Sequence, residues 1–358
     1  MFFCALQRTA LGGRGVHMRR VLTALMLFIL LASLPGSQGT SRPFNASQAL
    51  TTRAVADVRP GLRFGALTLV EAWDLISPHS DFGGLSGMAL VGTRNFLMVS
   101  DSGYRLRFKL AADGTARPGG FEKLPPPLPG YTGKFQYDGE ALTHDPATGR
   151  YWTAMEGMGQ IWCFEANDVR RTRTKQPILA SWPDNGGAEV LTRLPDGRFI
   201  VLSERAGPSG QPEGVMFSGD PAERSTTSFR FFHDAGRQGA ATDAAVLPDG
   251  RLVIIYRKLG LWPIFTTSIA IADPSKLKSG AMLTSTTIAV VKDRRLAENY
   301  EGVAVQQDKG GLSLWLVSDD NLQDWQHSRL VRFHIDPAAL RPSGLRPAKR
   351  AAPEPARP

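Results

Sequence analysis

The chain has 358 residues, of which 42% are hydrophobic and 21% are charged. This composition excludes a disordered, collagen-like or coiled-coil protein and provides enough apolar material for a large core. Of the net charge of +9, residues 1–39 contribute four arginines and no acid, and residues 341–358 contribute five basic residues and one glutamate. The segment between these ends is therefore nearly neutral, and we expect no nucleic-acid partner.

Residues 1–39 are typical of a signal peptide. Arg19 and Arg20 precede an uncharged apolar run over residues 21–34, and small residues follow before residue 40. Met18 is a candidate start, because residues 1–17 add nothing that a signal peptide needs. A membrane anchor is the alternative, but the run is short for a membrane span. The sequence thus predicts a periplasmic or secreted protein that is free of the membrane after cleavage.

After a lead-in over residues 40–63, one pattern repeats through residues 64–336. Each unit starts with a small or acidic residue, followed by a strand pattern of alternating apolar and polar residues. In most units a D-G or T-G turn and a second, apolar strand come next, and this combination predicts a β-hairpin. The five starts are separated by 54, 49, 54 and 58 residues. They are Ser86, Glu140, Glu189, Asp243 and Glu301.

Each hairpin is followed by further strand patterns, which makes four strands in about 50 residues, the period of a propeller blade. Fourth strands are expected at residues 121–124, 178–182, 228–232 and 286–291. The fifth unit ends at Ile335 without a fourth strand, so the earlier segment 67–76 is expected to complete it and close the ring. A β-sandwich is the alternative, but it fits this spacing poorly.

The predicted fold is therefore an all-β propeller with five visible blades. A sixth, degenerate blade has room in residues 40–65 or 205–227. The tail, residues 337–358, is rich in Pro, Ala and Arg and is expected to be disordered.

Several residues that often carry chemistry are expected to be structural. Cys163 lies in an apolar run and is expected to be a buried thiol. His144 lies beside a turn, away from the acidic strand ends described next. The tryptophans are spread through the blades and are expected to pack between them. They are Trp152, Trp162, Trp182, Trp262, Trp315 and Trp325.

Acidic residues recur at one end of the hairpins. The first strand starts with an acid in four of five units, and the second strand ends with one in four of five. Because the two strands are antiparallel, these positions lie at the same end of each hairpin, and in a propeller those ends converge around one mouth of the central channel. The set comprises Asp101, Glu140, Glu156, Glu189, Glu204, Asp243, Glu301, Asp319 and Asp320.

Carboxylates crowded in this way must bind protons or cations. Oxygen ligands in such numbers suit Ca²⁺ or Mg²⁺, and no two histidines have a spacing that suits zinc. Arg205 and Arg257 lie at the same end and are candidates for holding an anion beside the metal. The alternative is structural, since acids at strand ends also cap loops and pair with arginines.

Three segments resemble the family described as esterase-like activity of phytase: YDGEAL at residues 137–142, NYEGVA at residues 299–304 and VSDDN at residues 317–321. The resemblance covers roughly residues 64–336. It implies an exported bacterial β-propeller that hydrolyses phosphate or other esters, with calcium as the natural cofactor.

The first hypothesis is a Ca²⁺-dependent hydrolase of phosphate or other esters that acts as a monomer on a small anionic or ester substrate. The candidate metal ligands are Asp101, Glu140, Glu189, Asp243, Glu301 and Asp319. Glu156 and Glu204 are the candidate catalytic carboxylates, and Arg257 and Arg205 the candidate substrate contacts. The alternatives are a non-catalytic propeller that binds a ligand or protein at the same mouth and a calcium-dependent enzyme of the lactonase type.

Overall fold

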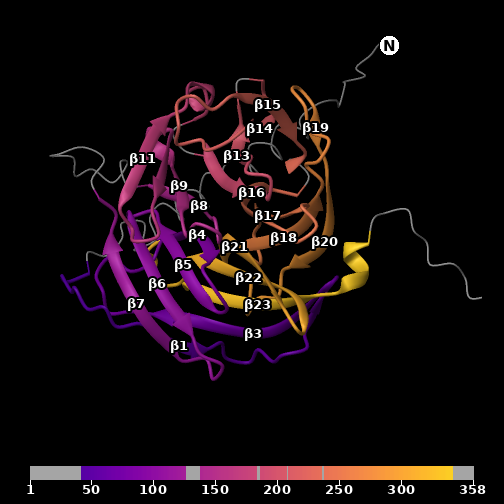
Figure 1. Cartoon of the computed structure of the whole chain (residues 1–358). Coiled ribbons are helices and arrows are strands. Elements are labelled where there is room, and N and C mark those ends of the chain that lie inside the picture. The colour runs from indigo at the N-terminus through magenta and orange to yellow at the C-terminus, as the bar shows by residue number, and fades with distance from the viewer. Residues whose placement is uncertain (1–41, 126–137, 184–185, 208, 236–237, 342–358) are drawn as a thin grey trace, which may run out of the picture. The chain divides into compact units, whose positions relative to one another are not determined.

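The computed structural model describes residues 42–125, 138–183, 186–207, 209–235 and 238–341. The predicted signal peptide and nearly all of the predicted tail lie outside these ranges. The described part from Pro43 onward is all-β, and its five sheets form a five-bladed propeller around a central channel (Figure 1). No helix among the described residues is long and apolar enough to cross a membrane.

Four antiparallel strands in chain order build each of the first two blades. Blade 1 contains β4 (Leu85–Leu90), β5 (Asn95–Ser100), β6 (Tyr104–Leu110) and β7 (Ala116–Lys123). Blade 2 contains β8 (Gly139–His144), β9 (Tyr151–Met155), β10 (Gln160–Phe164) and β11 (Arg170–Lys175).

Blades 3 and 4 repeat this order. Blade 3 contains β12 (Ala188–Arg193), β13 (Phe199–Ala206), β14 (Pro212–Phe217) and β15 (Ser228–His233), to which β19 (Met282–Leu283) adds a short parallel strand. Blade 4 contains β16 (Ala240–Val246), β17 (Leu252–Leu259), β18 (Phe265–Ala272) and β20 (Ser285–Val291).

Blade 5 closes the ring with chain from both ends of the propeller. Its first three strands are β21 (Asn299–Asp308), β22 (Gly311–Asp319) and β23 (Arg329–Ile335). The fourth is β3 (Leu67–Ile76), which pairs antiparallel with β23. This confirms the predicted closure, which pairs the edge that β23 would otherwise expose. Within the lead-in, β1 (Thr51–Ala54) and β2 (Arg63–Phe64) pair with β3, so the described residues form five blades and no sixth.

The predicted fourth strand of blade 2 is wrong. Residues 177–179 form a short 3-10 helix, η3 (Pro177–Leu179), and the strand is β11, which precedes it. The sequence RRTRTK of β11 is polar because this outer strand has one sheet edge and much of its surface in solvent. The apolar Leu179 and Trp182 that suggested a strand instead cover the core between blades 2 and 3.

The core consists of five apolar clusters, and each cluster fills the space between two neighbouring blades. Trp152, Trp162 and Trp315 are buried in these clusters, as expected. Cys163 is also fully buried, which raises the pKa of its thiol to about 12 and makes it unreactive. Trp262 and Trp325, however, are 68% and 57% exposed, so the expectation that they pack between blades is wrong.

Candidate functional site

A β-bulge at the start of each innermost strand aims one side chain out of the strand pairing. In β4, β8, β12 and β21 the strand register skips one residue, and those residues are Ser86, Glu140, Glu189 and Glu301. A bulge leaves its extra residue unpaired and turns its side chain. The innermost strands of successive blades are neighbours around the channel. The bulges therefore direct these side chains to a common place.

The second strand of each blade ends beside the bulge of the first. In register, the equivalent positions are Asp101, Glu156, Glu204, Arg257 and Asp319. Four of the five are acids and the fifth is an arginine, as the repeat pattern predicted.

These two sets of side chains line a cavity of about 570 Å³ at one mouth of the channel, which we call the acidic cavity. Seven of its carboxylates were expected there, namely Asp101, Glu140, Glu156, Glu189, Glu204, Glu301 and Asp319. Asp138 is an eighth. The cationic side chains that line it are Arg205, Arg257 and Lys258, and no His or Cys is among its described lining residues. The cavity is thus strongly acidic.

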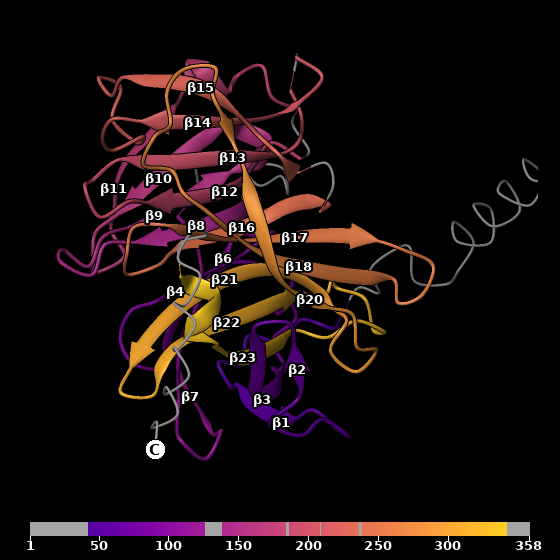
Figure 2. The same cartoon turned by 90° about the vertical axis from the view of Figure 1, so that its right-hand side faces the viewer.

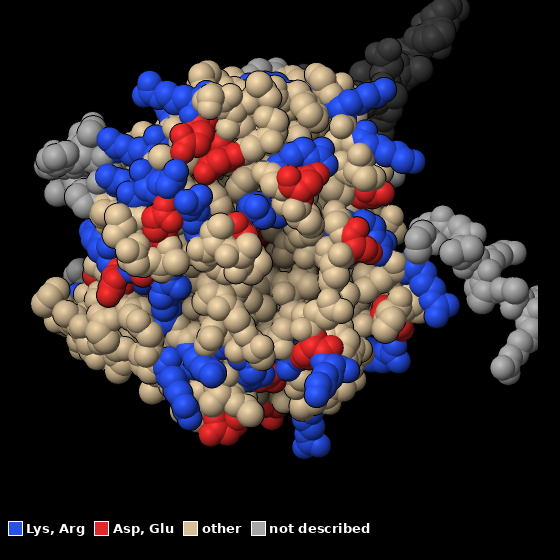
Figure 3. All heavy atoms as spheres, viewed as in Figure 1, with Lys and Arg blue, Asp and Glu red and all other residues tan. Residues whose placement is uncertain are grey.

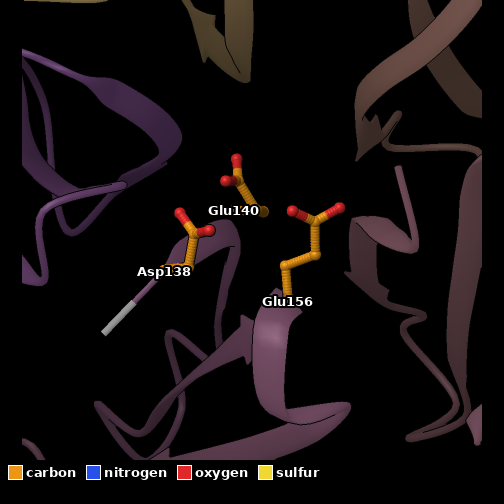
Figure 4. Close-up of side chains that lie close together, drawn as sticks. All are labelled: Asp138, Glu140 and Glu156. Carbon is orange, nitrogen blue, oxygen red and sulfur yellow. The ribbon is translucent and has the colours of Figure 1, made fainter. Parts of the chain in front are cut away.

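Three carboxylates converge at the blade 2 side of the acidic cavity. One oxygen from each of Asp138, Glu140 and Glu156 lies within 4.8 Å of the others, and Figure 4 shows the three groups facing a common space. Asp138 and Glu140 flank the start of β8, and Glu156 begins the short helix η2 (Glu156–Met158) after β9. A set of hard oxygen donors at this separation suits Ca²⁺ or Mg²⁺. We call it the carboxylate triad.

Glu156 is held in place by the loop that enters blade 3. Its Oε1 accepts hydrogen bonds from the backbone N–H groups of Gly186 and Gly187, the latter at 2.9 Å. Gly186 has a φ of +84° and Arg205 lies against it, so a side chain there would be strained and would collide with Arg205. Glu156 also shares a side-chain hydrogen bond with Glu189. Its carboxylate is therefore fixed relative to both neighbours.

Arg257 organises the opposite side of the acidic cavity. Its guanidinium forms ion pairs with Glu204 and Glu301 and donates to Asn299 Oδ1 at 2.7 Å. Asn299 Nδ2 in turn donates to Glu301 at 2.9 Å and to Asp319 at 3.3 Å. Arg257 is thus engaged by protein groups. Arg205 has a side chain that is 62% exposed and lies 3.7 Å from Glu204, so it is the more available cation.

Comparison with known proteins identifies a family model that matches this chain. The family model described as Phytase-like, esterase-like activity of phytase, matches residues 80–322, which is more than half of the chain and includes all eight carboxylates of the cavity. The chain belongs to this family. The match confirms the resemblance inferred from the three sequence segments.

Other comparisons add little to the description of this phytase-like chain. No curated protein matches it at a significant level. Among solved structures, the major allergen Mala s 1 of Malassezia sympodialis is similar with a TM-score of 0.41 and 13% identity, over 76% of this chain and 90% of that one. A likeness at this level does not bear on function.

Two acids expected in the ring lie outside the acidic cavity of the phytase-like chain. The bulged residue of β16 is Thr242, one position before Asp243, so Asp243 points the other way. It is fully buried and accepts hydrogen bonds from the N–H groups of Val303, at 2.7 Å, and Ala244, at 2.8 Å. Asp243 therefore links blade 4 to blade 5 and is not placed to bind a metal in the cavity.

Asp320 is also outside the cavity. Its Oδ1 accepts from Gly84 N–H at 3.0 Å, and its Oδ2 accepts from the Ser328 hydroxyl at 2.9 Å. These bonds connect the start of blade 1 to the loop between β22 and β23, which gives Asp320 a structural role. Of the adjacent pair, only Asp319 reaches the cavity.

Asp138 was not included in the predicted ring, although it belongs to the DGE segment that begins blade 2. The available signal was its position two residues before Glu140. Residues two apart on a strand point to the same face, so Asp138 is expected on the same side as Glu140. The carboxylate triad shows that the two side chains do lie together. The sequence therefore contained enough to find Asp138.

Burial dominates the electrostatics of the acidic cavity. It raises the pKa values of Glu140, Glu189 and Asp319 well above the ordinary range, and neighbouring carboxylates raise them further. For Glu140 these neighbours include Glu189 and Glu301. Burial also raises the pKa of Glu301 to about 7, against the opposing effect of Arg257. Without a cation, the cavity therefore retains protons at neutral pH.

The opposite mouth of the channel is different. A cavity of about 510 Å³ there is lined by the far ends of the innermost strands and includes His144, which confirms that this histidine is remote from the acidic cavity. Burial lowers the pKa of His144. Figure 3 shows one face of the protein with a central hollow bordered mostly by uncharged residues, and both basic and acidic side chains lie around it.

Proposed function

We propose that the phytase-like chain is a metal-dependent hydrolase of phosphate or other esters, with Ca²⁺ as the metal, acting in the acidic cavity. The observation that carries the proposal is the carboxylate triad, since three carboxylates that face one space are costly without a cation. Membership of the Phytase-like family supports a hydrolase-type propeller. Export to the periplasm or the medium, as the apolar run at residues 21–34 predicts, is part of the same proposal.

The residues of the triad fit a hard divalent cation. Asp138, Glu140 and Glu156 would hold it, and all three can offer oxygen atoms. When bound, the cation supplies positive charge that polarises the phosphoryl or acyl oxygen of the ester. This revises the ligand set expected from sequence, because only Glu140 is kept from that set, and Asp138 and Glu156 are added.

The remaining groups have roles that follow from their contacts. Glu189 retains a proton because burial and the charges of Glu156 and Glu301 raise its pKa, so it can donate that proton to a leaving oxygen. The water that attacks the ester must lose a proton, and Glu156, which shares the hydrogen bond with Glu189, can accept this proton and return it to Glu189. Glu204, expected as a catalytic residue, is ion-paired with Arg257 and serves to position it.

A substrate anion would be repelled by the carboxylates unless cations face it. Arg205 and Lys258 are both exposed cations at the rim, and Arg205, which lies beside Glu204, is the contact that we assign to the anionic or ester group. Arg257, which forms ion pairs with Glu204 and Glu301, keeps those two side chains in place. Its direct contribution to substrate binding is expected to be smaller than that of Arg205.

The proposal is tested with protein stripped by a chelator and titrated with Ca²⁺ by calorimetry. We expect binding that Asp138→Asn and Glu140→Gln each weaken about tenfold or more, since each removes one charged ligand. Asp196→Asn is the control, because Asp196 lies in an exposed turn between β12 and β13, where it pairs with Arg198. The same samples are assayed for turnover of simple phosphate esters, carboxylic esters and lactones.

The outcomes separate the functions that the sequence left open. Calcium-dependent turnover of a phosphate or carboxylic ester that the triad variants abolish supports the proposal, and turnover of lactones alone identifies the lactonase-type alternative. Calcium binding without turnover of any ester favours a ligand-binding propeller, for which the absence of His and Cys from the described cavity lining already provides an argument. Absence of calcium binding would show that the acids are structural.

A further inference from the structure

A second cavity, of about 800 Å³, lies beside the acidic cavity. One wall is the tip of the β17–β18 hairpin, which extends beyond the neighbouring strands in Figure 2. The others are the segment between β20 and β21 and the loop between β22 and β23. The aromatic and aliphatic residues that line it are Trp262, Pro263, Ile264, Phe265, Ala297 and Trp325. We call it the aromatic cavity.

Exposed apolar side chains are concentrated around the aromatic cavity. Half of the large hydrophobic side chains that are exposed among the described residues lie here, namely Leu259, Leu261, Trp262, Ile264 and Trp325. Trp325 stacks on Phe265 with ring centres 6.5 Å apart and an interplanar angle of 13°. A soluble protein rarely exposes such a patch unless it binds something.

The aromatic and acidic cavities share the same three chain segments. Leu259 lines the acidic cavity, and its cross-strand partner Phe265 lines the aromatic one. Glu301 of β21 lines the acidic cavity, and Glu298, the residue before β21, lines the aromatic cavity. In the loop after β22, Asn321 lines the acidic cavity and Trp325 lines the aromatic cavity. The two cavities are therefore adjacent compartments at one mouth of the propeller.

Most polar groups of the aromatic cavity are already paired within the protein. Asp293 pairs with Arg295 at 2.6 Å. Glu298 pairs with Arg329 at 3.1 Å and with His327 at 2.9 Å. These groups therefore have little capacity left for the hydroxyl groups of a sugar.

Two cations remain available. Lys292 and Arg294 are exposed, and neither forms an ion pair with a described residue. The guanidinium carbon of Arg294 lies 4.4 Å from the ring centre of Trp262, so a positive charge is held against an exposed aromatic face. A ligand that matches this surface has a flat apolar ring for the tryptophans and a negative charge for the two cations.

We propose that the aromatic cavity binds an anionic aromatic group, and that this group is the non-reacting part of the ester whose bond is hydrolysed in the acidic cavity. The second half of this statement rests on the proposed function, whereas the first half does not. Binding energy from such a remote group raises the specificity for substrates that carry it. The substrate class is then an ester with an acidic aromatic substituent.

The binding step is tested by calorimetric titration of the purified full chain with naphthalene-2-sulfonate, which has a flat ring and a charge. Naphthalene-2-methanol provides the ring alone and methanesulfonate the charge alone. We expect Trp262→Ala and Trp325→Ala each to weaken binding of the sulfonate about tenfold, as for other aromatic stacking sites. Trp325→Phe should recover most of the affinity. Val169→Ala is the matched control, because Val169 is similarly exposed but lies between β10 and β11.

The charge is tested with the double variant Lys292→Gln, Arg294→Gln. We expect this double variant to weaken the binding of naphthalene-2-sulfonate about tenfold and to change the binding of naphthalene-2-methanol by less than about twofold, because only the sulfonate carries a charge. The proposal would be overturned if methanesulfonate bound as tightly as naphthalene-2-sulfonate, or if the tryptophan variants left the affinity for naphthalene-2-sulfonate unchanged. Binding of anionic phosphatidylglycerol vesicles in place of the naphthalene probes would also overturn it and would identify a lipid surface as the occupant.

The turnover step has a separate readout. For a chain that hydrolyses esters, the ratio of kcat/KM for a sulfonated naphthyl ester to that for a methyl ester should fall about tenfold in Trp325→Ala and stay unchanged in the control Val169→Ala. An unchanged ratio would show that the aromatic cavity does not bind substrate. If no ester is hydrolysed, the proposed function fails, but the titrations still decide whether the cavity binds anionic aromatic groups.

Discussion

The two sides of the acidic cavity use the same residue types in opposite ways. On the blade 2 side, the carboxylate triad and Glu189 crowd together, and the raised pKa values of Glu140 and Glu189 show how costly their charges are. On the other side, Arg257 of blade 4 pairs with Glu204 of blade 3 and Glu301 of blade 5. We call these the triad side and the paired side.

A single residue accounts for most of this contrast. At the end of the second strand, blades 1, 2, 3 and 5 carry an acid and blade 4 carries Arg257. The paired side therefore contains a counter-ion of its own for Glu204 and Glu301. The triad side must bind protons or a cation to keep its carboxylates together. The contrast thus indicates where a metal is expected and where it is not.

Removal of Arg257 is expected to have the largest effect. In Arg257→Gln, Glu204 and Glu301 lose their counter-ion while they remain in a buried site, which should lower the free energy of unfolding by about 3–5 kcal/mol. Urea denaturation of the metal-free protein measures this change. The additional substitution Glu301→Gln should restore part of the loss, because it removes one of the uncompensated charges.

Arg198→Gln is the matched control for this comparison. Arg198 pairs with Asp196 at 2.7 Å in an exposed turn, and such surface pairs contribute less than about 1 kcal/mol. Equal losses in the two variants would contradict the idea that the paired side depends on a buried ion pair.

The pH dependence of stability tests the triad side. Burial raises the pKa values of Glu140 and Glu189, so between their ordinary value of 4.5 and the raised values the folded protein binds more protons than the unfolded chain. The free energy of unfolding should therefore fall as the pH rises through this window. For metal-free protein we expect a loss of about 1–3 kcal/mol between about pH 5 and pH 8, measured by urea denaturation.

Two changes should reduce this pH dependence. Glu189→Gln removes one of the groups that retains a proton, and saturating Ca²⁺ stabilises the ionised forms of the triad. A stability that rises with pH over the same range in metal-free protein would show that these carboxyls are ionised without a cation, and the contrast between the two sides would fail.

The smallest effect is expected at Asp243, which the repeat pattern wrongly placed in the cavity. Asp243→Asn loses one acceptor for the N–H groups of Val303 and Ala244, which should cost about 1 kcal/mol in stability. The affinity of the Asp243→Asn protein for Ca²⁺ should change by less than about twofold, in contrast to the loss of Ca²⁺ affinity expected for Asp138→Asn. A large loss of affinity in Asp243→Asn would restore it to the ligand set.

Much of the fold was predictable because its signals are local. The turns with the sequences PDG and ATG place Gly149, Gly197 and Gly250 at positive φ, as such turns require. The unit length identified the propeller, and the missing fourth strand of the last unit identified the closure by β3. The error in blade 2 arose because β11 is a polar outer strand, and hydrophobic pattern alone does not report such strands.

The candidate site was predicted in outline and not in its details. Seven of the nine expected carboxylates line the acidic cavity, because the start of the first strand and the end of the second lie at the same end of each antiparallel hairpin. Asp243 was misplaced because the bulge in β16 comes at Thr242, and a shift of one residue reverses the direction of a side chain. Trp262 and Trp325 were misassigned because composition does not tell a buried tryptophan from one on a hairpin tip.

The sequence by itself determined the five-bladed repeat, its closure and the end of the channel where acids gather, because these depend on periodicity and on strand direction. The tertiary structure decided which acids share a space, which of them Arg257 neutralises, and that two tryptophans form a second cavity beside the first. Those features arise from side chains of different blades that meet across the channel mouth. Contacts between residues so distant in the chain depend on bulges and loop paths, which no local pattern specifies.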